Sequence, residues 1–262
     1  MPHFSMPVSS VMTAPVVTVA ETARLPEANQ ILRDRNISCL AVTGADGRPR
    51  GVLSRTDLLR VGRVEARTRG RGTWLTLPDR PVREAMRSEI IAVDPATPLS
   101  GAARTMVARR IHRVFVTNGE ALVGVVSTKD VLLVIDMARI STPIREVMSA
   151  PAYTIPVTAR LSLATDRLER AHVTGLCVVD EDEWPVGTFT QTEALASREL
   201  DGNTPLEEVM SYAMLCLHVR TPLYRAAAYA HATRARRVLA VEDNRVQGVL
   251  TGLDFARFAA SA

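Results

Sequence analysis

The residues best suited to hold a ligand form a short motif that ends at Asp130. A glycine, two mostly apolar residues, a hydroxyl residue, two variable residues and an acid follow one another. A hydroxyl residue with an acid three positions later, just before an apolar stretch, is typical of a helix start. The free amides and dipole at such a start attract phosphate, and a short carboxylate can accept from two vicinal ribose hydroxyls. The motif occurs four times, as Gly51–Asp57, Gly124–Asp130, Gly187–Glu193 and Gly248–Asp254.

The motif alone is compatible with two roles. In a capping box, the hydroxyl accepts from a helix amide and the acid accepts from the amide of the cap residue, which contributes ~1 kcal/mol without any ligand. In a nucleotide site, the hydroxyl contacts phosphate and the acid contacts ribose. Aspartate in three copies favours the nucleotide site, whereas Glu193 in the third copy suits a cap.

Basic residues at a fixed offset before the motif are candidate phosphate ligands. In the second copy this offset separates His112-Arg113 from the motif glycine, Gly124. Arginine can contact a phosphate through two parallel hydrogen bonds. Lys129, the only lysine of the chain, lies inside the second motif. At the same offset before the other glycines stand Cys39-Leu40 in the first copy, Gly175-Leu176 in the third and Arg236-Arg237 in the fourth.

Each motif closes a longer repeat that begins at a methionine. A leucine and then an alanine follow the methionine at the same distances in all four copies, and spacings of three and four place such positions on one helix face. A short alternating strand precedes this helix, two strands joined by a turn follow it, and a second helix starts at the motif acid. The methionines are Met12, Met86, Met148 and Met210, and the predicted first helices cover residues 25–35, 99–110, 161–170 and 223–234.

The repeats predict an α/β (α+β) fold of four β-α-β-β-α units, at residues 8–62, 82–137, 144–199 and 206–260. One unit is marginal in size, so units should pair to bury their sheet faces. We expect the first to pair with the second and the third with the fourth. An insertion between the first two units contains Arg60, Arg63, Arg67, Arg69 and Arg71, and we interpret it as a mobile basic loop.

Composition limits the class of protein further. The chain has 262 residues, 47% hydrophobic content and a net charge of +4, which is typical of a globular protein. No apolar run approaches the ~18 residues of a membrane helix and no signal pattern starts the chain, so we expect a cytoplasmic protein that does not enter a membrane. Three single cysteines, Cys39, Cys177 and Cys216, are expected to be buried reduced thiols.

The four units resemble CBS domains, and the chain resembles two tandem pairs of them, each a Bateman module. The Gly-x-x-(Ser/Thr)-x-x-Asp turn is the adenosine-nucleotide signature of that family, and the layout is similar to that of the AMP-activated kinase gamma subunit. His112-Arg113 is similar to the phosphate-contacting His-Arg of that subunit. By this resemblance the nucleotide-binding residues are Ser54, Thr56, Asp57, His112, Arg113, Ser127, Thr128, Lys129 and Asp130, with Arg236, Arg237, Thr251 and Asp254 as weaker candidates in the second module.

The resemblance implies a regulatory protein that binds AMP, ADP, ATP or S-adenosylmethionine between paired domains. It also implies a homodimer and signalling to a protein target that the sequence does not identify. We expect no enzyme, because no nucleophile motif and no set of residues at metal spacing is present. The alternative is a protein that binds nucleic acid or an acidic partner through the arginines of residues 60–72, with the CBS modules as scaffold.

Overall fold

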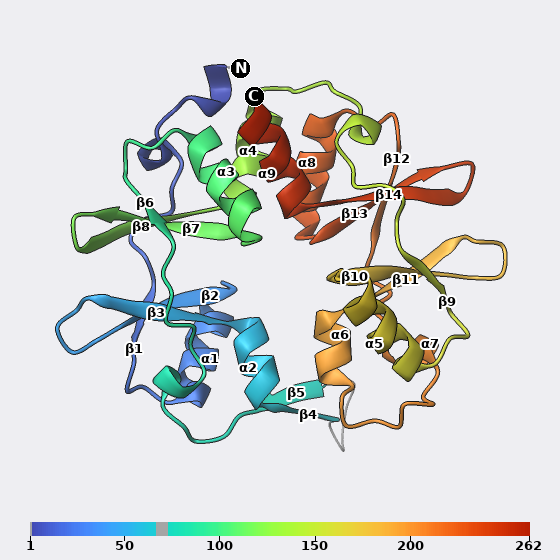
Figure 1. The fold of residues 1–262 in the computed structure, drawn as a ribbon, viewed down its shortest axis with the longest axis horizontal. Coiled ribbons are helices and arrows are strands. Elements are labelled where there is room, and N and C mark those ends of the chain that lie inside the picture. The colour runs from blue at the N-terminus through green and yellow to red at the C-terminus, as the bar shows by residue number, and fades with distance from the viewer. Residues whose placement is uncertain (1, 67–72) are drawn as a thin grey trace.

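The computed structural model describes residues 2–66 and 73–262, and four similar units lie in a two-by-two arrangement within it (Figure 1). Each unit has a three-stranded sheet in which the first strand pairs parallel with the middle strand, and the middle strand forms an antiparallel hairpin with the last. In the first unit these elements are β1 (Thr18–Ala20), α1 (Leu25–Asp34), β2 (Cys39–Thr43), β3 (Pro49–Ser54) and α2 (Arg55–Val61).

The other three units repeat this order. The second unit contains β6 (Ala92–Val93), α3 (Leu99–Arg109), β7 (Arg113–Asn118), β8 (Ala121–Ser127) and α4 (Thr128–Met137). The third contains β9 (Thr154–Pro156), α5 (Leu161–Arg170), β10 (Gly175–Val179), β11 (Pro185–Thr190) and α6 (Gln191–Ala196). The fourth contains β12 (Leu215–His218), α8 (Leu223–Thr233), β13 (Arg237–Glu242), β14 (Arg245–Thr251) and α9 (Gly252–Ser261).

The predicted first helices are confirmed to within one residue at each end. In each helix the repeated leucine and alanine are buried, as their spacing on one face predicts. The second helices begin two residues earlier than predicted, directly after the cap hydroxyl, as at Ser127 before α4. Each unit opens with a short helical turn at its apolar segment: η2 (Val8–Ser10), η3 (Val82–Glu84), η4 (Ile144–Glu146) and α7 (Leu206–Val209). A further turn, η1 (Pro2–Phe4), precedes them.

Segments between neighbouring units interlock at the motif glycine. Thr13, which follows Met12, forms a β-bridge with Val125 of the second unit, and Arg87 after Met86 forms one with Val52 of the first. The Met12 side chain occupies the space where a side chain on Gly124 would lie. The third and fourth units are joined in the same way: Ser149 bridges Val249, and a Cβ on Gly248 would lie 2.6 Å from the Met148 sulfur.

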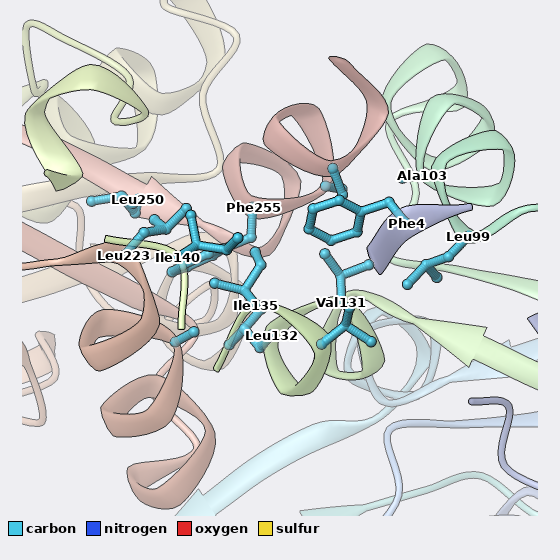
Figure 2. Packing of buried hydrophobic residues seen from close by; sticks show 14 of the residues in the cluster. Phe4, Leu99, Ala103, Val131, Leu132, Ile135, Ile140, Leu223, Leu250 and Phe255 are labelled. Carbon is cyan, nitrogen blue, oxygen red and sulfur yellow. The ribbon is translucent and has the colours of Figure 1, made fainter. Parts of the chain in front are cut away.

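Helices of the second and fourth units form a large apolar interface. Helix α3 packs against α9, and α4 packs against α8 and α9. Figure 2 shows this core, in which Val131 and Ile135 of α4 lie near Phe255 of α9. Phe4 of the N-terminal segment is buried in the same cluster and meets Phe258 edge to face, with 6.3 Å between ring centroids.

The first and third units meet through polar contacts between α2 and α6. Arg198, just after α6, donates from Nη1 to the Leu59 carbonyl oxygen at 2.5 Å and from Nη2 to that of Gly62. Arg63 pairs with Glu199 at 3.3 Å. These donors satisfy carbonyl groups at the end of α2, which the helix itself leaves without partners.

Two sequence expectations need correction. Residues of the basic insertion form paired strands at its described ends, β4 (Arg63–Ala66) and β5 (Thr73–Thr76), while Arg67, Arg69 and Arg71 lie outside the described residues. Cys177 is buried and Cys39 is half-buried, but Cys216, on edge strand β12, is exposed. Within the described ranges, no helix has both the length and the apolar character needed to cross a membrane.

Candidate functional site

All four motifs form capping boxes. In the second unit, Asp130 Oδ2 accepts from the Ser127 amide at 2.7 Å and from the Ser127 hydroxyl at 2.8 Å. The same arrangement joins Ser54 to Asp57, Thr190 to Glu193 and Thr251 to Asp254. A cap uses only one carboxylate oxygen, so the second oxygen decides whether an acid can also bind a ligand.

Two of the acids use the second oxygen within the protein. Asp57 Oδ1 lies 3.2 Å from Arg60 Nη1 and 3.2 Å from Arg87 Nε. Asp254 Oδ1 accepts from the Ser149 hydroxyl at 2.6 Å and pairs with Arg257 at 2.7 Å. Both acids are almost fully buried, and their partners already neutralise them.

Among the described residues, Asp130 and Glu193 keep the second oxygen available, since both cap bonds of Glu193 go to Oε2. Across residues 2–66 and 73–262, Oδ1 of Asp130 has no hydrogen-bond or ion-pair partner in another residue. The position that Arg87 and Ser149 occupy at the other two sites is occupied here by Thr13. Burial raises the pKa of Asp130, while hydrogen bonds from Ser127 and the charge of Lys129 oppose this shift. Asp130 also lines a cleft of about 460 Å³ between α4 and the N-terminal segment.

The two basic pairs lie at the contacts between units. Arg113 of the second unit donates from Nη2 to the Ser38 hydroxyl of the first unit at 3.0 Å. Arg237 of the fourth unit donates from Nη2 to the Thr174 carbonyl oxygen at 2.6 Å and to its hydroxyl at 2.8 Å. A Cβ on Gly175 would lie 2.7 Å from the Arg237 guanidinium carbon, so the glycine leaves room for this side chain.

The residues paired across each hairpin show that counting back from the motif glycine aligned the basic positions wrongly between units. Arg113 pairs with Ser127 across its hairpin, whereas Cys39 pairs with Ser54, because the first hairpin has a longer turn than the second. Ser38 and Thr174 therefore occupy the places of His112 and Arg236, and counting back from the glycine missed both. Counting forward from the first leucine of each first helix finds them, since no loop of variable length intervenes.

Basic side chains from three units lie near one another beside Asp130. The charges of these groups act on one another across the units, and we name the set the central cluster. Thr174 and Gly175 bring the third unit into contact with it. The central cluster consists of Arg55, His112, Arg113, Lys129, Arg234, Arg236 and Arg237.

The electrostatics of the central cluster reflect excess positive charge. Partial burial, and then the charges of Arg113, Arg237 and Arg236, lower the pKa of His112. Burial, followed by Arg234, Arg113 and Arg236, lowers the pKa of Lys129, with Asp130 acting in the opposite direction. Among the described residues, no member of the cluster forms an ion pair with a carboxylate at 4.0 Å or less.

Two helix N-termini meet beside the same cluster. Helix α4 starts at Thr128 and α9 starts at Gly252, and a Cβ on Gly252 would lie 2.5 Å from the Thr128 hydroxyl oxygen. Helix N-termini carry partial positive charge. The first-unit candidates are held differently: Ser54 bonds to Asp57, and Asp57 in turn pairs with two arginines. The Thr56 hydroxyl has no hydrogen bond in the described part of the chain. The candidates that the structure brings together are His112, Arg113, Ser127, Thr128, Lys129 and Asp130 with Arg236, Arg237 and Thr251.

The repeated unit and its signature turn match a known family. The model of the CBS domain matches residues 8–63, 82–136 and 144–198. The chain belongs to the CBS domain family. The fourth CBS unit has the same order of elements as the other three.

Relatives of this CBS protein have been found by sequence and by structure. An uncharacterized 33.4 kDa protein in a ribosomal RNA operon of Thermofilum pendens is 28% identical over 65% of this chain and 57% of its own length. The uncharacterized protein MJ1404 of Methanocaldococcus jannaschii is 32% identical over 48% of this chain and 31% of its own. The chain therefore spans less than two thirds of the length of these relatives.

A crystal structure resembles the whole CBS arrangement. Protein MJ1225 of Methanocaldococcus jannaschii, described as a candidate archaeal homologue of the AMPK gamma subunit, has a TM-score of 0.75 to this chain at 16% identity. The match covers 97% of this chain and 99% of MJ1225. At this identity the likeness establishes the shared fold of four CBS units.

Proposed function

We propose that this CBS protein binds an adenosine nucleotide, with the ribose at Asp130 and the 5′-phosphates at the central cluster, and transmits the bound state to a protein partner without catalysing a reaction. The observation that carries the proposal is the available Oδ1 of Asp130 beside cations that have no carboxylate partner among the described residues. A carboxylate oxygen accepts ribose hydroxyls, and the guanidinium groups donate to phosphate.

The charge of the central cluster favours phosphorylated ligands among the candidates. AMP, ADP and ATP bring negative phosphates to His112, Arg113 and Lys129, and burial, followed by the charges of neighbouring arginines, lowers the pKa of both His112 and Lys129. S-adenosylmethionine brings no phosphate, and its sulfonium and ammonium groups outweigh its carboxylate, so the same cations repel its net positive charge. We therefore expect the three nucleotides to bind more tightly than S-adenosylmethionine.

Asp254 provides a second nucleoside position of lower affinity. It occupies the same place in the fourth unit as Asp130 in the second, beside Thr251 and close to Arg237. A ribose there must first displace the Ser149 hydroxyl and Arg257 from Oδ1. Exchanging these internal partners for ligand hydroxyls reduces the net gain from binding.

The described arginines of the basic insertion argue against nucleic-acid binding as the main function. Arg60 is paired with Asp57, and Arg63 is paired with Glu199. A phosphate backbone would have to compete with both carboxylates. The cations of the central cluster lie in another part of the fold, and none of them forms an ion pair with a carboxylate among the described residues, which supports the nucleotide proposal.

The test is a thermal-shift and calorimetric panel of AMP, ADP, ATP and S-adenosylmethionine on the wild type and on Asp130→Asn. A ligand at 100 times its Kd adds ~2.7 kcal/mol of stability, which for a chain of this size raises Tm by roughly 5–10 °C. Asp130→Asn keeps an oxygen for the cap but loses the charge, so it should remove most of the shift. Asp136→Asn, on the solvent side of the same helix, is the matched control. An unchanged shift in Asp130→Asn contradicts the proposal.

A further inference from the structure

The two pairs of opposing units are packed to different extents. Between the second and fourth units, α4 lies against both α8 and α9, and α9 lies against both α3 and α4. Between the first and third units, α2 packs against α6 and leaves α5, on the far side of α6, largely uncovered (Figure 1). Among the described residues, the groove between α5 and α6 therefore lacks the helix that fills the equivalent groove of the fourth unit.

The length of the second helix explains this difference. Helices α4 and α9 have ten residues each, whereas α2 has seven and ends at Val61. Three fewer residues shorten a helix by about 4.5 Å. After Gly62 the chain continues into strand β4, so it leaves the helix before α2 can extend along α5.

The face of α5 that should meet an opposing helix carries polar side chains. Counted from the first leucine of each first helix, Thr165 takes the place of Ala103 in α3, which is fully buried. Asp166 takes the place of Arg104, which donates from Nη1 to the Ala260 carbonyl oxygen of α9 at 3.3 Å. Both residues of α5 are only half-buried. The position is that of a helix-packing surface, but α2 does not cover it.

A cleft of about 410 Å³, which we name the α5–α6 cleft, lies at this place on the third unit. Leu161 of α5 and Ala194 of α6 line it, and Leu200, which is 52% exposed, adds apolar surface beyond the end of α6. An apolar side chain that lines a cleft and stays half exposed is suited to contact with another molecule.

The acidic groups of the α5–α6 cleft are available to an occupant. Glu169 is exposed, and its carboxylate has no hydrogen-bond or ion-pair partner within residues 2–66 and 73–262. Asp166 pairs with Arg170 of its own helix at 2.8 Å, in a pair that solvent reaches. Arg198, the basic residue of the cleft, uses both terminal nitrogens on carbonyl groups at the end of α2. Basic side chains on an occupant therefore complement the cleft.

We propose that the α5–α6 cleft is a docking site for an amphipathic helix of a partner protein, with apolar residues toward Leu161 and Leu200 and lysine or arginine toward Asp166 and Glu169. The fold supports a helix as the occupant, because the equivalent grooves of the second and fourth units each hold one. Helices fill such grooves with apolar residues three and four positions apart. No lining residue is a candidate nucleotide ligand, so the inference is independent of the proposed function.

The probe is a fluorescent, helix-stapled peptide of residues 128–137 with Asp130→Lys and Asp136→Lys. Its sequence is that of α4, which fills the equivalent groove of the fourth unit, and the two changes make it basic. Fluorescence anisotropy with the full chain, without nucleotide, measures its binding. The double variant Asp166→Lys/Glu169→Lys of the protein should weaken binding about ten-fold or more. Glu181→Lys, an exposed residue in the β10–β11 turn of the same unit, is the matched control and should leave the affinity unchanged.

Thr165→Trp tests the α5–α6 cleft by shape, because the larger side chain fills it without changing its charge. It should weaken peptide binding as much as the charge reversal does, with urea denaturation showing that the variant is folded. Absence of binding, or equal binding by the wild type and both cleft variants, overturns the inference. A wild-type dimer that Thr165→Trp separates into monomers in sedimentation also overturns it, since a second copy of the chain then occupies the cleft.

Discussion

Arg113 crosses from the second unit to the first and donates from Nη2 to the Ser38 hydroxyl at 3.0 Å. The equivalent Arg237 makes the same kind of contact with Thr174 in the other half of the molecule. Each arginine is therefore held at a unit boundary by one nitrogen, which leaves its other donors for a ligand. The several donors of a guanidinium group are needed to contact the neighbouring unit and a ligand at the same time.

Arg113→Lys should weaken ATP binding about ten-fold, because an ammonium group cannot reproduce the two directions of the guanidinium fork. Calorimetry with ATP measures the change. Arg109→Lys, on the exposed end of α3, keeps the same charge and should leave affinity unaltered. Equal affinities of the two variants would show that Arg113 serves only the contact with Ser38.

Gly124→Ala should destabilise the fold by about 1–3 kcal/mol, because the atoms nearest to its Cβ all belong to the Met12 side chain. Met12→Ala removes the obstacle. The double variant should therefore lose less stability than the sum of the single variants, as urea denaturation of all four proteins will show. Strict additivity would mean that the glycine is required for another reason.

Acidification should destabilise the unliganded protein through His112. Its folded pKa is lowered from 6.5, so the unfolded chain binds more protons near that pH and stability falls as pH decreases through it. A bound phosphate favours the imidazolium, so nucleotide binding should strengthen as pH falls from 7.5 to 5.5, with proton uptake. His112→Gln should reduce both trends, measured by urea denaturation and calorimetry at the two pH values. The exposed His231→Gln of α8 serves as control, and identical pH profiles in the two variants would contradict the assignment.

Asp254→Asn should destabilise the unliganded protein by about 1–3 kcal/mol, since it weakens contacts of a buried carboxylate with Ser149 and Arg257. Asp130→Asn should cost less, because its second oxygen has no partner to lose in the described structure. Urea denaturation without ligand compares the two. A larger loss in Asp130→Asn would assign that residue a mainly structural role.

Arg198→Ala should loosen the contact between α2 and α6, because the carbonyl groups at the end of α2 lose their donors. Hydrogen exchange should speed up in these two helices. It should stay slow in α4 and α9, which are held by the apolar core around Ile135 and Phe255. Faster exchange in all four helices would show that the two interfaces open together.

Much of the fold followed from local patterns. Leucine and alanine at helical spacing located the first helices to within one residue, whereas the motif acid placed the start of the second helices two residues too late. Glycine and methionine were recognised as repeating positions, but their mutual contact joins segments far apart in sequence, as between Met12 and Gly124. The sequence pattern therefore determined the helices and strands. Only the tertiary structure shows why the glycine and the methionine recur, because the methionine of one unit packs on the glycine of its neighbour.

The candidate site divides in the same way. Residue type and spacing identified Asp130, Lys129 and His112-Arg113, because a hydroxyl–acid turn and a basic pair are local features. Ser38 and Thr174 were missed, since the turn before each motif varies in length. Which carboxylates stay available was decided by tertiary structure: Arg87 and Ser149 reach Asp57 and Asp254 from other units, while Thr13 does not reach Asp130. The sequence determines which side chains can bind a nucleotide, and the packing of units determines which are already bound by the protein itself, because their partners come from distant parts of the chain.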